Sequence, residues 1–498
     1  MVFPVVGGNE SKVYDVENSL RFNNDDSPKL TFTPSSAGNR RTFTLSVWFK
    51  LSVYSTGERV LLAADDGTGG NNNFDYIAIN GNDKLFVYGY EGSENQQLIS
   101  TQLFRDPSAW YHLVVAFDTT QSTASNRIKA YVNGNQITAF DTANYPSQNF
   151  QTRINNNNAQ RISSYPDQDT SYFDGYMCEY NLIDGSQLAP TSFGEFNTNG
   201  VWIPKKYTGS YGTNGFYLEF KQTGTSANSS GIGADTSGND HHWAVSNLAA
   251  LDVTEDTCTN NFATLNSLKT TSTNANLSEG NTKFTITANG TSQNRNTFAT
   301  ITFPDSGKWY METKVTHSSL TSDSGNQVYI GVIENPQNVD HRSTANVNSI
   351  STNGIFTDVR LVGTISDAIQ HGTNGSATSY NTDPDWSSGD IIGIALDMDN
   401  GRIYYHLNGT YYDDASGNVP NPATPANHNH SFTVPSNGLT YFMSILRYND
   451  GTVEMEANFG NPSYSISSGN NDGKYGNFEY APPSGYYALC TKRLAEFG

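Results

Sequence analysis

The sequence predicts an all-β protein that consists of two β-sandwich domains in tandem, with a connecting segment rich in Gly, Asn and Ser. Aromatic residues make up 12% of the 498 residues, charged residues only 15%, and there are 44 glycines. This is a mixture of strand-forming and turn-forming residues. Apolar runs of strand length recur about every 8–15 residues, with turn residues between them. Long stretches of helix-forming residues are missing.

The chain begins with a short segment, residues 1–12, that is apolar and then rich in glycine. Two interpretations stay open. It is either a disordered terminus or an N-terminal attachment peptide that docks onto a neighbouring subunit. We adopt the attachment peptide, because Val2, Phe3, Val5 and Val6 are unusually apolar for a free tail.

The first predicted sandwich covers residues 13–205, which read as a succession of short strands. Residues 42–51 alternate, so that Trp48 faces away from four apolar side chains, Phe43, Leu45, Val47 and Phe49. The other expected strands are residues 60–64, 74–79, 85–90, 97–102, 110–117, 129–132 and 173–182. Short strands separated by turn signals are typical of a sandwich or jelly roll.

Residues 206–270 form the connecting segment, which is rich in Gly, Ser, Thr and Asn but contains patterned islands such as GTNGFYLEF. Residues 216–220 fit a strand. We therefore expect this segment to pack on one or both sandwiches rather than to be a free linker.

The second predicted sandwich, residues 271–498, is organised around a β-hairpin at residues 389–409. Residues 391–396 are apolar and largely β-branched, which suits a buried strand. Asp399, Asn400 and Gly401 supply a tight turn, and residues 402–407 form the returning strand.

The hairpin sequence GDIIGIALDMDNGRIYYHLNG resembles the central signature of the SPRY domain. Three stretches resemble that family's other landmarks and follow in the family's order: residues 307–312 (GKWYME), 329–332 (YIGV) and 458–460 (NFG). The resemblance implies a β-sandwich that binds partners through loops at one end.

The long loops of this sandwich are expected at residues 334–355, 370–389 and 412–433. They would expose four aromatic residues as ligand-binding candidates, Tyr380, Trp386, Tyr411 and Tyr412. Exposed aromatic rings stack on sugars or anchor protein contacts. The alternative is that Trp386 and Tyr411 pack on the edge of the sandwich.

Three pieces of the first sandwich resemble the LamG, or concanavalin A-like, family: residues 110–114 (WYHLV), 131–134 (YVNG) and 173–180 (FDGYMCEY), followed by a short helical tail at 186–193. The resemblance implies a jelly roll that carries a calcium ion at its rim. Asp65, Asp66 and Asp118 are the candidate ligands, because calcium prefers carboxylate and carbonyl oxygens. The alternative is that they are solvated turn carboxylates.

Charge and cysteine content exclude several classes of function. The formal net charge is −20, and the basic residues form no run. Nucleic acid and anionic membranes are therefore not expected partners. No segment has the length and hydrophobicity of a signal peptide or a membrane span. The three cysteines, Cys178, Cys258 and Cys490, are too few and too scattered for a disulfide framework or a zinc site, and indicate a reducing cytoplasm.

The sequence also argues against an enzyme. Glucanases of the concanavalin A-like fold carry the motif E-x-D-x-x-E, which is missing here, and so are G-x-S-x-G and H-E-x-x-H. Two alternatives to a non-enzymatic adhesion protein stay open. One is a glycan-degrading enzyme whose site assembles across subunits, and the other is a purely structural capsid or tail component.

The arrangement as a whole resembles a family of tailed-phage virion proteins, including the stretches at residues 19–50 and 485–494. The resemblance implies a tail-fibre or head-decoration protein that is assembled in the host cytoplasm and then forms part of the virion. Its partners would be other virion proteins and a host surface glycan or receptor. It would form a homo-oligomer, with a trimer favoured.

Overall fold

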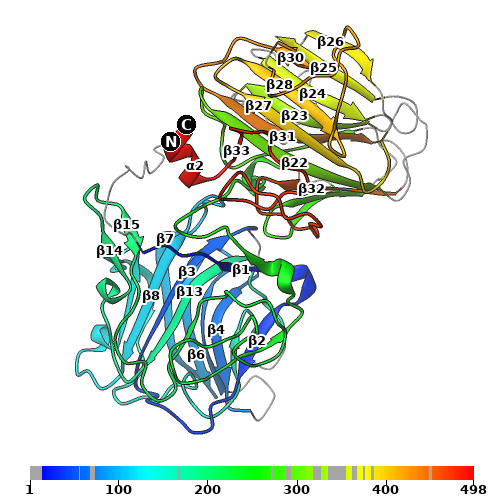
Figure 1. Ribbon diagram of the computed structural model, residues 1–498. Helices are drawn as coiled ribbons and strands as arrows, with labels where there is room; N and C mark the ends of the chain where they lie inside the picture. Colours follow the sequence, from blue (N-terminus) through cyan, green and yellow to red (C-terminus); the bar gives the residue numbers. More distant parts are fainter. Residues whose placement is uncertain are drawn as a thin grey trace. The chain divides into compact units, whose positions relative to one another are not determined.

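The computed structural model describes residues 14–54, 57–67, 73–165, 169–270, 274–287, 293–317, 327–334, 355–361, 367–373, 376–382, 386–424, 426–447 and 451–498. The expected attachment peptide, residues 1–12, lies outside this set. The chain divides between Asn260 and Asn261 into two compact units. Figure 1 shows the first in blue to green and the second in green to red. Both are built of strands, so the all-β prediction is confirmed.

The first unit is a sandwich of two antiparallel sheets. One contains, in order, β10 (Asn135–Gln136), β9 (Ile128–Val132), β8 (Tyr111–Asp118), β3 (Thr42–Leu51), β13 (Gly175–Asp184), β1 (Ser19–Phe22) and β18 (Val253–Thr254), and β16 (Phe216–Leu218) also pairs with β13. The other contains β11 (Phe140–Asn144), β7 (Glu94–Leu103), β6 (Lys84–Glu91), β5 (Asn73–Ile79), β4 (Arg59–Asp65), β12 (Gln160–Ile162), β2 (Lys29–Phe32) and β17 (Ala244–Ser246).

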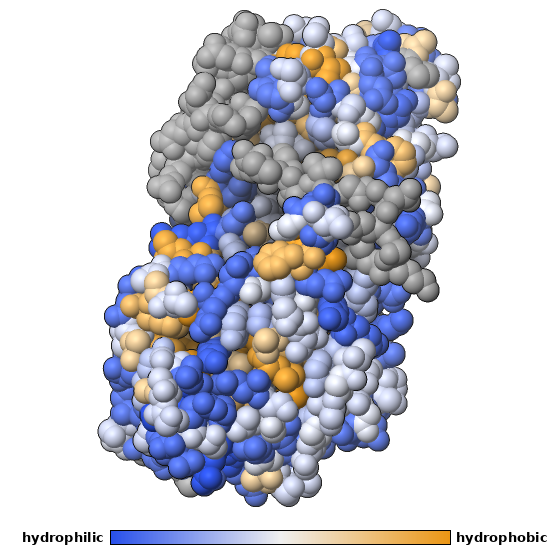
Figure 2. Space-filling view, turned by 90° about the vertical axis from the view of Figure 1, so that its left-hand side faces the viewer, coloured by the Kyte–Doolittle hydropathy of each residue, from blue (hydrophilic) through white to orange (hydrophobic). Residues whose placement is uncertain are grey.

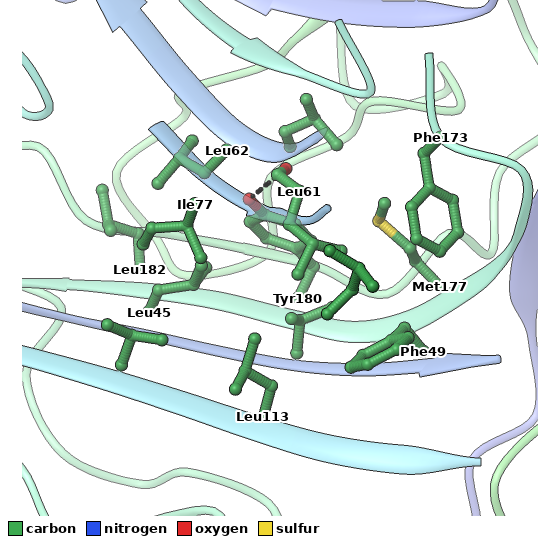
Figure 3. Packing of buried hydrophobic residues seen from close by; sticks show 14 of the residues in the cluster. Leu45, Phe49, Leu61, Leu62, Ile77, Leu113, Phe173, Met177, Tyr180 and Leu182 are labelled. Atoms are coloured by element: carbon green, nitrogen blue, oxygen red, sulfur yellow. Dashed lines mark hydrogen bonds between the residues drawn. The ribbon is translucent and has the colours of Figure 1, made fainter. Parts of the chain in front are cut away.

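The core of the first unit follows from strand alternation. The apolar side chains of β3 that were expected on one face are buried between the sheets, whereas Trp48 joins a separate cluster on the other face. Figure 3 shows this packing around Tyr180, whose hydroxyl donates to the carbonyl oxygen of Leu61 at 3.0 Å. This bond satisfies a polar group that would otherwise be costly to bury.

The segment expected to connect the sandwiches is divided between the two units. Its part up to Asn260 supplies β16 and β18 to one sheet of the first unit and β17 to the other. The expected helical tail at residues 186–193 contains only a 3-10 turn, η3 (Pro190–Ser192), and is followed by the hairpin of β14 (Gly194–Phe196) and β15 (Trp202–Pro204). The other 3-10 turns are η1 (Asn24–Asp26), η2 (Ala124–Asn126), η4 (Ala250–Asp252) and η5 (Ser267–Lys269).

The second unit also contains two sheets. The larger has β19 (Ala275–Ser278), β20 (Lys283–Thr287), β32 (Thr452–Asn458), β22 (Lys308–His317), β27 (Ile391–Asp397), β28 (Arg402–Leu407) and β29 (Thr410–Tyr411), with β30 (His430–Ser431) on β28 and β33 (Tyr487–Ala488) parallel to β22. The other has β21 (Gln293–Phe298), β31 (Leu439–Arg447), β23 (Gln327–Glu334), β24 (Ile355–Leu361), β25 (Asp367–Thr373) and β26 (Ser376–Thr382). Helix α2 (Thr491–Phe497) follows β33.

The predicted hairpin of the second unit is confirmed as β27 and β28, which pair from Ile392 with Leu407 to Asp397 with Arg402. The expectation of a loop over residues 370–389 is wrong in its first half, because β25 and β26 extend through it as a paired hairpin. A polar, Ser- and Thr-rich strand such as β26 lacks the hydrophobic alternation by which strands are recognised.

The surface is mostly hydrophilic on the face shown in Figure 2, and its apolar patches are small and scattered. Among the described residues the exposed large hydrophobic ones are Leu103, Phe196, Leu268, Val419 and Phe497. No helix in the described part of the chain has the length and hydrophobicity needed to cross a membrane.

Candidate functional site

Of the four loop aromatics predicted to bind ligand, the three whose side chains the structure describes are buried or partly buried. Trp386 is only 5% exposed and packs edge-to-face on His317 at 5.1 Å, and Tyr412 is fully buried in the core. The predicted exposure is therefore wrong for both. Tyr411 is partly buried against His406 at 5.5 Å. Tyr380 belongs to β26, and its side chain lies outside those that the structure describes.

The three predicted calcium ligands are not brought together. The Asp65 carboxylate pairs with the Arg161 guanidinium at 2.6 Å and is 8% exposed as a residue, and Asp66 accepts from Asn73. Asp118 lies at the end of β8 in the opposite sheet, where its carboxylate accepts from three side chains, those of Thr42, Thr120 and Gln121. In the described ranges no three Asp, Glu, His or Cys side chains gather as a metal site. Calcium stays a prediction.

A buried glutamate on β13 is the centre of a different site. Between the pairs Cys178–Trp48 and Asn181–Ser46, two residues of β13 oppose one of β3, which is a β-bulge. Glu179 is the bulged residue with a left-handed backbone, φ 51°. Such a conformation costs about 1 kcal/mol or more for a residue other than glycine, and it recurs at functional sites.

The bulge lets two consecutive side chains avoid the core between the sheets. Met177 and Tyr180 belong to that core, whereas Cys178 joins the cluster with Trp48 and Glu179 contacts tyrosines outside the core. Without the extra residue, strand alternation would place Glu179 on the same face as Met177. The bulge therefore decides where this carboxyl group lies.

Two tyrosines hold one oxygen of the Glu179 carboxyl group. Oε1 accepts from the Tyr14 hydroxyl at 3.0 Å and from the Tyr217 hydroxyl at 2.5 Å, and the two phenol oxygens are 2.9 Å apart. Burial, helped by the charge of Glu219, raises the pKa of Glu179 to about 7 against the hydrogen bonds from the two tyrosines. Burial and the Glu179 charge raise the pKa of both phenols above their usual range.

Glu179 lines a pocket of about 160 Å³. Its other lining residues are Tyr14, Asp15, Val16, Glu17, Asn18, Lys206, Tyr217, Glu219 and Lys221. The two lysines already have carboxylate partners, since Lys206 lies 3.5 Å from Glu219 and Lys221 lies 3.1 Å from Glu17. Within the described residues no hydrogen bond reaches Oε2 of Glu179.

A second pocket of about 350 Å³ adjoins the first and shares Lys206 and Tyr217 with it. Its aromatic wall consists of Tyr207 and Tyr211, whose rings meet edge-to-face at 5.1 Å, and Tyr211 stacks with Tyr217 at 6.3 Å. Its polar lining residues are Thr208, Ser210, Thr236, Ser237 and Asn239. We call the two pockets together the tyrosine groove.

The tyrosine groove combines partly exposed aromatic rings with hydroxyl, amide and carboxyl groups. Aromatic rings offer flat apolar faces, and the polar groups fix the orientation of a hydroxylated ligand by hydrogen bonds. This combination suits a sugar.

The sequence analysis did not identify the residues of the tyrosine groove as a binding site; it assigned them to a strand of the jelly roll or to the connecting segment. Glu179 lies inside the motif taken as the last strand of the jelly roll, and Tyr207, Tyr211 and Tyr217 lie in the connecting segment. The repeated Tyr and Gly of residues 207–217 (YTGSYGTNGFY) were the available signal. No sequence signal pointed to Tyr14, because it lies 165 residues before Glu179 and contacts it only in the folded protein.

Residues 24–189 match the family model described as the concanavalin A-like lectin/glucanases superfamily. The match supports the LamG-like resemblance of the first unit and spans about a third of the chain. Glu179 lies inside the matched range, whereas Tyr14, Lys206, Tyr207, Tyr211 and Tyr217 lie outside it. Most of the groove is therefore built by segments that flank the matched range. No curated protein matches this chain in sequence.

Three solved structures are among those that align with this chain. Mouse laminin alpha1 domains LG4-5 align over 87% of this chain and 83% of theirs, with 8% identity and a TM-score of 0.29. The SPRY domain of human HERC1 aligns over 35% and 87%, with 13% identity and a TM-score of 0.23. A Bacillus licheniformis β-glucanase aligns over 37% and 80%, with 11% identity and a TM-score of 0.25. Similarity at this level carries no information about function.

Proposed function

We propose that this protein binds carbohydrate through the tyrosine groove of its first unit and does not cleave it. The observation that carries the proposal is the placement of Tyr207 and Tyr211 beside the buried Glu179 carboxyl group in adjoining pockets. Ligand pockets typically have volumes of about 300–1,000 Å³. The two pockets, of about 160 and 350 Å³, together fall within this range, and we expect them to hold one or two sugar rings.

The charges around the groove favour a neutral or amino sugar over an acidic one. Four carboxyl groups line the first pocket, on Asp15, Glu17, Glu179 and Glu219, and both lysines are paired with carboxylates. An acidic sugar would need an unpaired cation to offset its desolvation. We therefore expect uronic and sialic acids to bind more weakly than neutral sugars.

We further propose that the binding serves adhesion or decoration on a phage particle. This role is inferred from the sequence resemblance to tailed-phage virion proteins. It includes assembly in the host cytoplasm, a homotrimer, and contacts with other virion proteins. Calcium at Asp65, Asp66 or Asp118 is part of the same proposal, and a chelator tests it.

One observation favours glycan cleavage as a second candidate. A carboxyl group with a pKa of about 7 is protonated in half of the molecules at neutral pH, as a general acid requires, and Glu219 lines the same pocket. A paired acid and carboxylate is the arrangement that glycoside hydrolysis uses.

A glycan array with the labelled full-length chain tests these proposals, with and without a chelator. We expect saturable binding to neutral glycans, which weakens about tenfold in Tyr207→Ala and Tyr211→Ala. Tyr90→Ala serves as the matched control, because Tyr90 is a partly exposed tyrosine of β6 that lines neither pocket.

The outcomes separate the candidates. New reducing ends in the supernatant that disappear in Glu179→Gln would establish the enzyme instead. Absence of both binding and cleavage, with correctly folded protein, would reject the groove as a carbohydrate site.

A further inference from the structure

Two of the three cysteines come together beside the tyrosine groove. The Sγ atoms of Cys178 and Cys258 lie 3.8 Å apart, although 80 residues separate them in the chain. Neither forms a disulfide in this structure. The cysteines are widely spaced in the sequence, which argued against a disulfide framework, yet two of them are close in the folded first unit. Cys490 belongs to the second unit.

Each cysteine is next to a segment that lines the first pocket, although neither cysteine lines the pocket itself. Cys178 directly precedes Glu179 on the β13 bulge and packs with Val16, Trp48 and Trp202. Cys258 lies within the tight turn closed by the backbone pairing of Thr257 and Asn260.

The Cys258 turn holds the N-terminal segment that lines the pocket. The Thr257 hydroxyl donates to the Val16 carbonyl at 2.9 Å, and the Val16 N–H donates to the Thr259 hydroxyl at 3.1 Å. Thr259 also donates to the Asp15 carboxylate at 2.8 Å. A link from Cys258 to Cys178 would therefore connect residues 15–16 to the strand that carries Glu179.

The turn is also fixed from the other side. Asp256 forms an ion pair with Lys50, both side chains being almost fully buried, and Lys50 lies 4.7 Å from the centre of the Tyr176 ring. A buried pair of this kind has a steep cost of disruption, so it keeps the turn on the sheet. Cys258 is thereby held next to Cys178 in the reduced protein.

We propose that Cys178 and Cys258 are a modification site that a low-molecular-weight disulfide, such as oxidised glutathione, converts reversibly into an intramolecular disulfide. We also propose that the bond fixes the wall of the tyrosine groove and strengthens ligand binding; this part rests on the proposed function. Closing the bond requires the sulfur atoms to approach by about 1.8 Å, since a disulfide measures about 2.05 Å.

The reaction balances as two thiol–disulfide exchanges. Cys258, the more accessible residue, loses its proton and attacks one sulfur of the small disulfide, which releases one small thiol. Cys178 then loses its proton and attacks the Cys258 sulfur of the mixed disulfide, which releases the second small thiol. Two protein thiols are oxidised, and one small disulfide is reduced to two thiols.

The rate of this reaction depends on pH. Burial and the neighbouring Cys178 thiol raise the pKa of Cys258 well above its ordinary value, so the reactive thiolate is scarce at neutral pH. Oxidation is therefore slow at neutral pH and faster in alkaline solution.

The test treats the full-length chain with oxidised glutathione at pH 8.5 and then alkylates the remaining thiols. We expect mass spectrometry of the native protein to find one peptide pair joined through Cys178 and Cys258, with Cys490 alkylated. The midpoint of thermal unfolding of the first unit should rise by about 5–10 °C and return after dithiothreitol.

Three variants serve as controls. Cys258→Ser and Cys258→Ala should lose both the linked peptide and the thermal shift, whereas Cys490→Ser should keep both. A glutathione adduct on Cys258 without the linked peptide, or three free thiols after prolonged oxidation, would overturn the proposal. Both of these contradicting results are measured on the wild-type chain, so they remain interpretable even if a Cys258 variant folds poorly.

Glycan binding by the reduced and oxidised forms separates this proposal from the proposed function. We expect the oxidised form to bind about threefold tighter, mainly through slower dissociation. A disulfide that forms in a protein without glycan affinity would reject the carbohydrate site and leave the modification site standing. Equal affinity of the two forms would reject the effect of the bond on the groove.

Discussion

Each of the two units buries a glutamate beside tyrosines, and the two glutamates differ in how they are satisfied. In the second unit, Glu312 on β22 is 1% exposed and both of its oxygens are occupied. It accepts five hydrogen bonds, from the Tyr310 and Tyr464 hydroxyls, the Asn458 amide and the backbone N–H groups of Glu479 and Tyr480. In the first unit, Glu179 accepts from two phenols at one oxygen and lines a pocket.

This difference separates a structural carboxylate from a candidate binding group. Burial raises the pKa of both glutamates, so the shift by itself does not distinguish them. The donors do. Two backbone N–H groups from residues 479–480 tie a late segment of the chain to β22 through Glu312, which is a role in holding the fold. Among the described residues, both donors to Glu179 are tyrosine hydroxyls.

Each unit also buries a histidine, and the two histidines have similar environments, because both ring nitrogens of each have a hydrogen-bond partner. His112 contacts the Ser46 hydroxyl with Nε2 at 2.9 Å and accepts from the Trp202 indole with Nδ1 at 2.9 Å. His406 contacts the Tyr310 hydroxyl with Nε2 at 2.8 Å and accepts from the Gly409 N–H with Nδ1 at 3.1 Å. Burial lowers the pKa of each to about 3, so both are neutral and structural.

The largest expected effect is the loss of Glu312. In Glu312→Ala, five donors lose their acceptor, three of them in buried hydrogen bonds and two in partly buried ones, and the free energy of unfolding of the second unit should fall by about 4 kcal/mol. Glu179→Ala should cost the first unit about 1 kcal/mol or less, because it also removes the burial cost of a carboxyl group. Urea titration with hydrogen exchange assigns each loss to its unit. Equal losses would contradict the distinction between the two glutamates.

The two histidines should destabilise both units in acid. Their folded pKa of about 3 lies below the unfolded value of about 6.5, so the unfolded chain binds more protons between these limits. Each unit should therefore lose up to about 1.4 kcal/mol per pH unit from this source as the pH falls below 6.5. Urea titrations at pH 7.0, 5.5 and 4.5 measure the loss. His406→Gln should flatten the slope of the second unit alone, and an unchanged slope would contradict the neutral assignment.

Glu179 should make the free energy of unfolding of the first unit depend on pH in the opposite direction. Its folded pKa of about 7 lies above its unfolded value, so the folded state binds the extra proton, and stability falls as the pH rises from about 4.5 to 7. We expect a contribution of about 1–2 kcal/mol between pH 5 and 7. Glu179→Gln, which mimics the protonated form, should remove this contribution. A slope that persists in the variant must come from another group.

The smallest expected change is in ligand affinity, on mutation of Tyr217, which lines both pockets of the groove. Tyr217→Phe removes one donor from Glu179 and should weaken glycan binding about threefold to tenfold, with little change in the fold. The corresponding variant of the second unit, Tyr464→Phe, removes a donor from Glu312 and should leave glycan binding unchanged. Isothermal titration with a glycan selected on the array compares the two. Equal weakening would show that the effect is not local to the groove.

The sequence by itself determined the strands, because their signals are local. The alternation in residues 42–51 predicted β3 and the face of each of its apolar side chains, and the Asp-Asn-Gly turn after residues 391–396 predicted the pairing of β27 with β28. The concanavalin A-like resemblance likewise depends on short motifs within single strands.

The tertiary structure decided which side chains are exposed and which meet. Trp386 and Tyr412 lie in stretches that the sequence marks as loops, yet both are buried because neighbouring strands cover them. Glu179 becomes a site only because one extra residue in β13 changes its face and because Tyr14 and Tyr217 reach it from 165 and 38 residues away. The cysteine pair spans 80 residues. A local pattern encodes the period of a strand, whereas contacts across such separations depend on how the sheets and the segments around them pack.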